Sequence, residues 1–202
     1  MTDHLRFAEK PALDQRLALE QLVRANGKLM DVLAALHRAD LPDALVGGGA
    51  VYQSVWNMLT GRDAWHGIKD IDVIYFDDTD LSYAAEDRTI RHLEALIPNP
   101  PVPLEIRNQA RVHLWFGAKF GFEVTPLGSA AESLTRYASR THAVAVRLEP
   151  GDTLHIEAPF GLDDLFAFRV TPNLAGKSRQ AHIEKGKRAH KVWPEVTVID
   201  WP

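Results

Sequence analysis

Cysteine is absent from this chain of 202 residues. Its absence excludes disulfides, thiolate zinc sites, iron–sulfur clusters and cysteine nucleophiles. Long apolar runs are absent too, since none reaches the length of a membrane span and residues 1–10 lack the apolar core of a secretory signal. No Asn-x-Ser/Thr glycosylation acceptor occurs. We therefore expect a cytoplasmic protein with no membrane partner.

A large excess of one charge is also missing. The chain has 23 Lys and Arg against 27 Asp and Glu, a formal net charge of -4. Such a balance gives no global attraction to nucleic acid or to an anionic membrane, so any phosphate-binding surface has to be local. The 46% hydrophobic and 25% charged residues are typical of a soluble globular protein, and the length suits one domain.

Several common catalytic signatures are missing as well. The glycines at 47–49 are not followed by the Lys-Ser/Thr of a P-loop, and the third glycine of the dinucleotide fingerprint is lacking. There is no Gly-x-Ser-x-Gly elbow, and no pair of histidines at helical spacing accompanies a glutamate as in zinc hydrolases. The sequence therefore gives little support to a serine or zinc hydrolase.

Two carboxylates stand inside an apolar strand pattern. Residues 69–77 read Lys-Asp-Ile-Asp-Val-Ile-Tyr-Phe-Asp, which predicts a buried strand. Because strand side chains alternate with a period of two, Asp70 and Asp72 are expected on one face, where ionised carboxylates repel each other unless cations hold them. The pair predicts a divalent metal site. The alternative is that one aspartate faces solvent while the other caps a turn or pairs with Lys69.

The N-terminal half predicts helices around short strands. Apolar residues at helical spacing indicate two helices over 13–39 with a break at Asn26-Gly27. A brief strand at 44–46 runs into the three glycines, and a helix over 50–60 follows them. Another helix is expected over 84–96.

The remaining segments are less regular. Leu104-Glu105-Ile106 predicts a strand, which residues 112–116 are expected to extend or pair with. Residues 143–147 and 153–156 predict a hairpin, and Asp163 is expected to cap a short helix. Residues 176–192 form a basic helical segment, which either holds RNA or a nucleotide or is a solvated helix face.

Further residues could complete a site around the aspartate pair. A glycine turn that opens a helix exposes N–H groups suited to phosphates, although Gly47, Gly48 and Gly49 also fit an ordinary tight turn. Glu105 offers a third carboxylate from a neighbouring strand. Ligation by oxygen alone favours Mg²⁺ or Mn²⁺.

Basic residues follow Glu105 closely. On a continued strand, its face would be shared by Arg107, Gln109, Arg111 and His113. Arginines near a carboxylate cluster can clamp phosphate with two hydrogen bonds, so Arg107 and Arg111 are candidate nucleotide ligands. The same arginines could instead neutralise acidic residues as structural ion pairs.

The order of these features resembles a known group. An apolar strand ending in Gly-Gly, a helix, an apolar-Asp-x-Asp-apolar strand and an apolar-Glu-apolar strand follow one another, as in the nucleotidyltransferase superfamily of the DNA polymerase β type. Segments 69–77, 107–113 and 159–166 resemble a bacterial family of nucleotidyltransferase-like proteins. The likeness covers most of the chain from about Leu29 onward.

The resemblance implies an α+β (α/β) fold, with a mixed β-sheet flanked by helices in a single domain over 1–202. Its parts are N-terminal helices in 1–40, a core with the metal and NTP site in 41–116, and an extension in 117–202. The resemblance further implies that Gly48 and Gly49 cradle nucleotide phosphates. The implied metal ligands and catalytic residues are Asp70, Asp72 and Glu105.

Three functions are compatible with these features. The first is metal-dependent transfer of a nucleoside monophosphate from an NTP to an acceptor hydroxyl, with release of pyrophosphate. The second is an inactive nucleotide- or protein-binding module that keeps the fold, and the third is metal-dependent phosphodiester hydrolysis. Retention of all three candidate carboxylates favours an enzyme. The acceptor, whether a small molecule, RNA or a protein, and the oligomeric state are left open.

Overall fold

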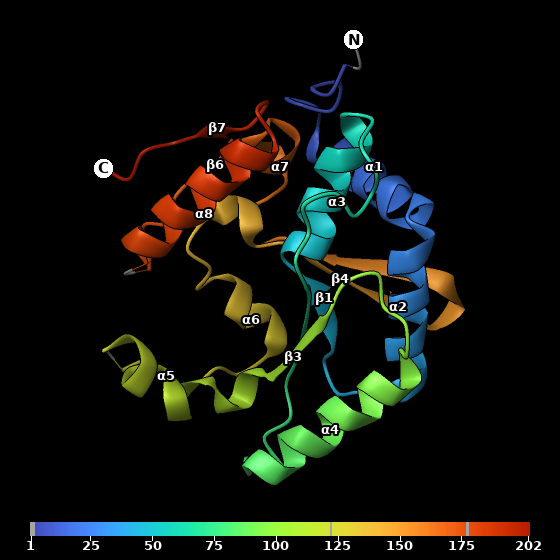
Figure 1. Ribbon diagram of the computed structural model, residues 1–202, viewed down its shortest axis with the longest axis vertical. Coiled ribbons are helices and arrows are strands. Elements are labelled where there is room, and N and C mark those ends of the chain that lie inside the picture. Colours follow the sequence, from blue (N-terminus) through green and yellow to red (C-terminus); the bar gives the residue numbers. More distant parts are fainter. Residues whose placement is uncertain (1–2, 122, 177) are drawn as a thin grey trace.

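A mixed sheet forms the centre of the computed structural model, which describes residues 3–121, 123–176 and 178–202 (Figure 1). Within these residues a five-stranded sheet has the order β3-β2-β1-β4-β5. The strands are β1 (Leu45–Gly47), β2 (Ile71–Tyr75), β3 (Leu104–Asn108), β4 (Ala145–Glu149) and β5 (Thr153–Glu157). Only β2 and β3 run parallel, while β1 is antiparallel to β2 and β4, and β4 to β5.

Helices cover both sides of the sheet. In Figure 1, α1 to α4 lie on one side of the strands and α5, α6 and α8 on the other. The α-helices are α1 (Ala12–Ala25), α2 (Gly27–Ala39), α3 (Gly49–Leu59), α4 (Tyr83–Leu96), α5 (Val112–Phe120), α6 (Ala130–Leu134), α7 (Asp163–Phe166) and α8 (Arg179–Val192). A small parallel pair, β6 (Arg169–Val170) and β7 (Thr197–Val198), packs near α8. The fold is α+β, as predicted.

Local signals explain where the early helices begin and end. The Asn26 side chain accepts a hydrogen bond from the Leu29 N–H and so caps α2, which confirms the predicted break between α1 and α2. Ser82 caps α4 in the same way through the Ala85 N–H. Among the described residues, no helix is both long and apolar enough to cross a membrane.

The two faces of the sheet bury different side chains. Ile71, Val73 and Tyr75 of β2 enter the main core, where α1, α2 and α3 pack. Ile74 points the opposite way, into a smaller cluster with Leu134 of α6. Since side chains alternate along a strand, Asp72 shares the face of Ile74. The strand therefore buries one face completely and carries its carboxylate on the other.

The predicted strand over 112–116 is wrong, because this segment belongs to helix α5. Strand β3 ends at Asn108, whose side chain accepts a hydrogen bond from the Ala110 N–H and opens a 3-10 turn over Gln109–Arg111. The Asn108 amide group also bonds the Asp77 backbone, which fixes this end of the strand. The predicted alternation beyond Arg107 is therefore wrong as well.

The C-terminal predictions had mixed outcomes. The hairpin is confirmed, with β4 and β5 joined through a turn at Pro150–Asp152, and so is the helix within 176–192. The expected cap at Asp163 is wrong. Leu162 holds the cap position of α7, while the Asp163 carboxylate accepts a hydrogen bond of 3.0 Å from the Gln15 side chain. Lys177, part of the basic segment, lies outside the described residues.

Candidate functional site

A pocket of about 230 Å³ surrounds the aspartate pair. Four parts of the chain build it: the glycine turn with the start of α3, the approach to β2, the segment before β4, and α8. Its lining residues are Gly48, Gly49, Tyr52, Gln53, Lys69, Asp70, Asp72, Tyr137, His142, Lys185 and Arg188. The structure thus brings both aspartates and two of the three glycines to one cavity.

The backbone at Gly48 approaches Asp72 closely. Gly48 has φ +60°, and a Cβ atom there would lie 2.6 Å from Asp72 Oδ2. A side chain at this position would meet both backbone strain and the carboxylate, so the turn needs glycine. Gly47 lies in β1, opposite Asp72 in the register, and is not part of the pocket lining.

Negative charge accumulates around Asp72. Burial, and after it the Asp70 carboxylate, raise the pKa of Asp72 to about 6, while Lys185 acts in the opposite direction. Burial likewise raises the pKa of Tyr137, with Asp72 and Glu105 as the next causes. A bound cation would relieve this repulsion.

The residues present fit a divalent cation. Within the described parts of the chain, no group of three or more His, Asp and Glu side chains is close enough to hold a metal by itself. Mg²⁺ is, however, commonly bound by one or two carboxylates together with substrate phosphates. Asp70 and Asp72 line one pocket and supply hard oxygen ligands for such an ion. The raised pKa of Asp72 shows that its charge lacks sufficient compensation within the protein.

Glu105 lies beside Asp72 but lines a different cavity. The two residues are paired in the parallel register of β2 and β3. The Glu105 carboxylate is about half exposed and lies 3.3 Å from the Arg107 guanidinium. Glu105 and Arg107 line a second cavity, of about 570 Å³, whose wall also includes Asp72 and Tyr137. The two cavities therefore meet at Asp72 and Tyr137.

Arg111 is held away from both cavities. Its guanidinium forms an ion pair with Glu86 and donates to the Leu81 carbonyl, and both charged side chains are about nine-tenths buried. It lines neither the aspartate pocket nor the neighbouring cavity. The structural ion pair, the alternative left open by the sequence, describes Arg111, whereas Arg107 stays next to Glu105.

The sequence did not link several of the pocket residues to the aspartate pair. Lys185 and Arg188 line the aspartate pocket from α8, and Lys185 is at the same time exposed to solvent. Their spacing of three residues, which places them on one helix face, was the available signal. Arg188 is anchored by donating to the Gly67 carbonyl. The pocket therefore combines cations from α8 with the carboxylates of the β2 region.

His142 is the least expected member of the lining. It is 2% exposed, and neither ring nitrogen has a hydrogen-bond partner in the described structure. Its ring stacks on Tyr52, with centroids 4.8 Å apart. Burial lowers the pKa of His142 well below its usual value, so the imidazole is neutral at pH 7. A buried polar ring that lines a cavity without a partner is suited to a ligand's hydrogen bond.

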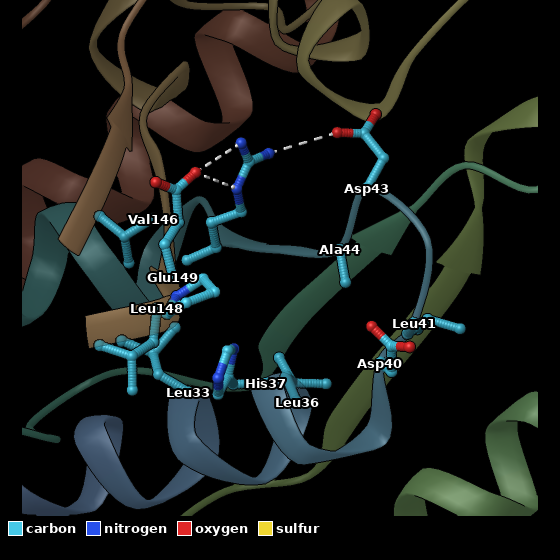
Figure 2. A pocket seen from close by; sticks show the side chains of 12 residues that line it. Leu33, Leu36, His37, Asp40, Leu41, Asp43, Ala44, Val146, Leu148 and Glu149 are labelled. Atoms are coloured by element: carbon cyan, nitrogen blue, oxygen red, sulfur yellow. Dashed lines mark hydrogen bonds and ion pairs between the residues drawn. The ribbon is translucent and has the colours of Figure 1, made fainter. Parts of the chain in front are cut away.

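A third cavity, of about 490 Å³, lies between α2 and β4 (Figure 2). Three of its charged side chains form ion pairs with one another, because Arg147 lies 2.8 Å from Glu149 and 3.4 Å from Asp43. None of the sequence-predicted site residues lines it. We therefore centre the candidate site on the two cavities that meet at Asp72.

Comparison with known proteins agrees with this geometry. A family model described as nucleotidyltransferase matches residues 34–198, a segment that contains the whole pocket lining. No curated protein matches the sequence. One solved structure, an NMR structure that reveals a CCA-adding enzyme head domain, is similar with a TM-score of 0.72 and 23% identity, covering 91% of this chain and 95% of that chain. This likeness confirms the predicted fold and shows nothing beyond the fold.

Proposed function

Because this chain belongs to the nucleotidyltransferase family, we propose that it transfers a nucleoside monophosphate from an NTP to an acceptor hydroxyl and releases pyrophosphate. One observation carries the proposal: a single pocket gathers the Asp70 and Asp72 carboxylates, a glycine turn at a helix N-terminus, and cations from α8. Carboxylates that hold cations and bases that hold phosphates are the two requirements of phosphoryl transfer.

The donor triphosphate fits the aspartate pocket. Gly48 and Gly49 open α3, an 11-residue helix, whose positive end and exposed N–H groups favour an anion. Lys69, Lys185 and Arg188 add positive charge around the same space. These groups bind and orient the phosphates, and the neutral His142 donates a hydrogen bond to the nucleotide.

In this proposal the carboxylates of Asp70, Asp72 and Glu105 hold Mg²⁺ or Mn²⁺. Asp70 and Asp72 would bind the ions on the triphosphate side, and Asp72 with Glu105 would bind on the acceptor side. The ions, when bound, stabilise negative charge on the phosphates and make the acceptor hydroxyl more acidic. Asp72 belongs to both cavities and so acts at the centre of the reaction.

A thermal-shift screen tests the proposal. ATP, CTP, GTP and UTP are each added with Mg²⁺ or Mn²⁺ to the wild type, to Asp70→Asn/Asp72→Asn, and to Asp78→Asn. Asp78 is an exposed carboxylate after β2 and serves as the matched control. We expect at least one NTP to raise the melting temperature of the wild type and the control only when metal is present.

The double variant is expected to lose this stabilisation. If it is stabilised as strongly as the wild type, the assignment of Asp70 and Asp72 is wrong. Stabilisation of the wild type without any divalent metal would instead favour an inactive nucleotide-binding module. Analysis of the products distinguishes transfer from hydrolysis, because hydrolysis leaves free nucleoside monophosphate and no nucleotidylated acceptor.

A further inference from the structure

The larger of the two cavities that meet at Asp72 has its own chemistry. Its volume is about 570 Å³, within the range of roughly 300–1,000 Å³ typical of small-molecule sites. Strands β2 and β3 line it with Asp72, Glu105 and Arg107, and α5 also contributes to its lining. The cavity thus joins the carboxylates of β2 and β3 to side chains of α5.

Apolar side chains contribute much of the lining, beside polar residues such as Glu123, Thr125 and Ser133. Val112, Trp115 and Phe116 line the cavity from α5, and Leu127 lines it from the segment before α6. Lys119 lies over the Trp115 ring, 5.5 Å from its centroid, and covers part of that face. A pocket with several apolar and aromatic side chains beside placed polar groups suits a ligand that has both an apolar body and a polar group.

The arginines of this cavity are engaged within the protein. Arg107 lies 3.3 Å from the Glu105 carboxylate. Arg136 donates to the Thr125 carbonyl at 2.6 Å and to the Thr125 hydroxyl at 3.1 Å. A polynucleotide acceptor would instead call for a groove of cations and stacking side chains that follows several phosphates. The cavity is better matched to a compact molecule than to the end of a nucleic acid.

We propose that the acceptor is a small hydroxyl-bearing molecule with an aromatic or apolar body. Its body lies against Val112, Trp115 and Leu127, and its hydroxyl points to Asp72 and Glu105. This inference rests on the proposed function, since it assigns the acceptor of that reaction. In the transfer, the acceptor oxygen bonds to the α-phosphorus, the bond to the bridging oxygen of pyrophosphate breaks, and the hydroxyl proton leaves to solvent.

Two tryptophan substitutions on one helix provide the test. Val112→Trp places an indole inside the cavity, whereas Leu114→Trp places the same group on the outer side of α5, where Leu114 is 55% exposed. Binding is followed by saturation-transfer NMR with Mg²⁺ and a non-hydrolysable NTP analogue. The probes are 2-phenylethanol, tyrosol and 2-naphthaleneethanol, beside an RNA trinucleotide with a free 3′ hydroxyl and a serine tripeptide.

We expect the aromatic alcohols to bind the wild type and Leu114→Trp, and to bind Val112→Trp roughly tenfold more weakly because the indole occupies their space. The trinucleotide and the peptide are expected to give no signal. Binding of either polymer fragment, equal binding of the alcohols to Val112→Trp, or no alcohol binding at all would overturn the inference.

The NTP-dependent thermal shift is measured on the same three proteins. If the wild type shows no shift, the proposed function itself fails. If the shift is present while the alcohols do not bind, only the acceptor assignment fails. Val112→Trp is expected to keep the shift, since Val112 does not line the aspartate pocket. Loss of the shift in Val112→Trp would mean that the cavity holds the nucleotide rather than the acceptor.

Discussion

Replacing Asp72 with Asn should stabilise the protein in the absence of metal. The pKa of Asp72 rises from 3.8 to about 6, chiefly through burial and then through Asp70. That difference corresponds to about 3 kcal/mol, because one pKa unit is about 1.4 kcal/mol. The value is an upper limit on the gain, since an amide at position 72 keeps a cost of burial.

The effect has a defined pH dependence. The native protein binds the Asp72 proton more tightly than the unfolded chain does, so this group favours folding most below about pH 4. Its contribution falls as the pH rises from about 4 to about 6 and is lost above that range. Asp72→Asn lacks this titration, so the stability difference between variant and wild type should grow from acid to neutral pH.

Urea denaturation in EDTA at a series of pH values between 4 and 8 measures this difference. Asp78→Asn, at an exposed position, should show no such trend. Mg²⁺ and the NTP identified by the thermal-shift screen should stabilise the wild type and not Asp72→Asn. With both added, the wild type should therefore become the more stable of the two proteins. A stability difference that does not change with pH, or a variant less stable than the wild type at every pH, would refute the reasoning.

Three other substitutions test separate parts of the account. Gly48→Ala should cost at least about 1 kcal/mol in urea denaturation and abolish the NTP-dependent thermal shift. Gly161 has a similar positive φ but open space around it, so Gly161→Ala should cost stability without affecting NTP binding. Equal NTP-dependent shifts in the two variants would contradict this. His142→Phe should keep the fold and weaken NTP binding in calorimetric titration, and unchanged affinity would exclude His142 as a ligand. Arg111→Met should cost about 3–5 kcal/mol by leaving Glu86 buried without its partner, and a loss below about 1 kcal/mol would show that the pair is not structural.

Local patterns predicted the elements that carry the aspartates. The period of two in residues 71–75 correctly placed Asp72 opposite the buried Ile71 and Val73, because alternation depends only on neighbouring residues. The glycine turn before α3 was also predicted, because consecutive glycines between a strand and a helix are a local signal too. The short apolar pattern around Glu105 likewise indicated the strand that carries the third carboxylate, which the structure pairs in register with Asp72.

Contacts between distant segments account for what the sequence did not predict. His142, Lys185 and Arg188 reach the aspartate pocket from segments more than 60 residues further along the chain. A local pattern can place Lys185 and Arg188 on one helix face, but it does not show what that face meets. Arg111 was misplaced because β3 ends at Asn108, whose side chain bonds the Asp77 backbone. Periodicity alone predicted that the strand continues past this point, but a long-range hydrogen bond ends it at Asn108.

Anomalous diffraction from Mn²⁺ tests the central claim most directly. Crystals are grown with Mn²⁺ and a non-hydrolysable analogue of the NTP that gives the largest thermal shift. The account predicts an anomalous peak within ligand distance, about 2.2 Å, of the Asp70 and Asp72 carboxylates, with the triphosphate between Gly48 and Arg188. A metal and triphosphate bound elsewhere, with neither aspartate in contact, would contradict it.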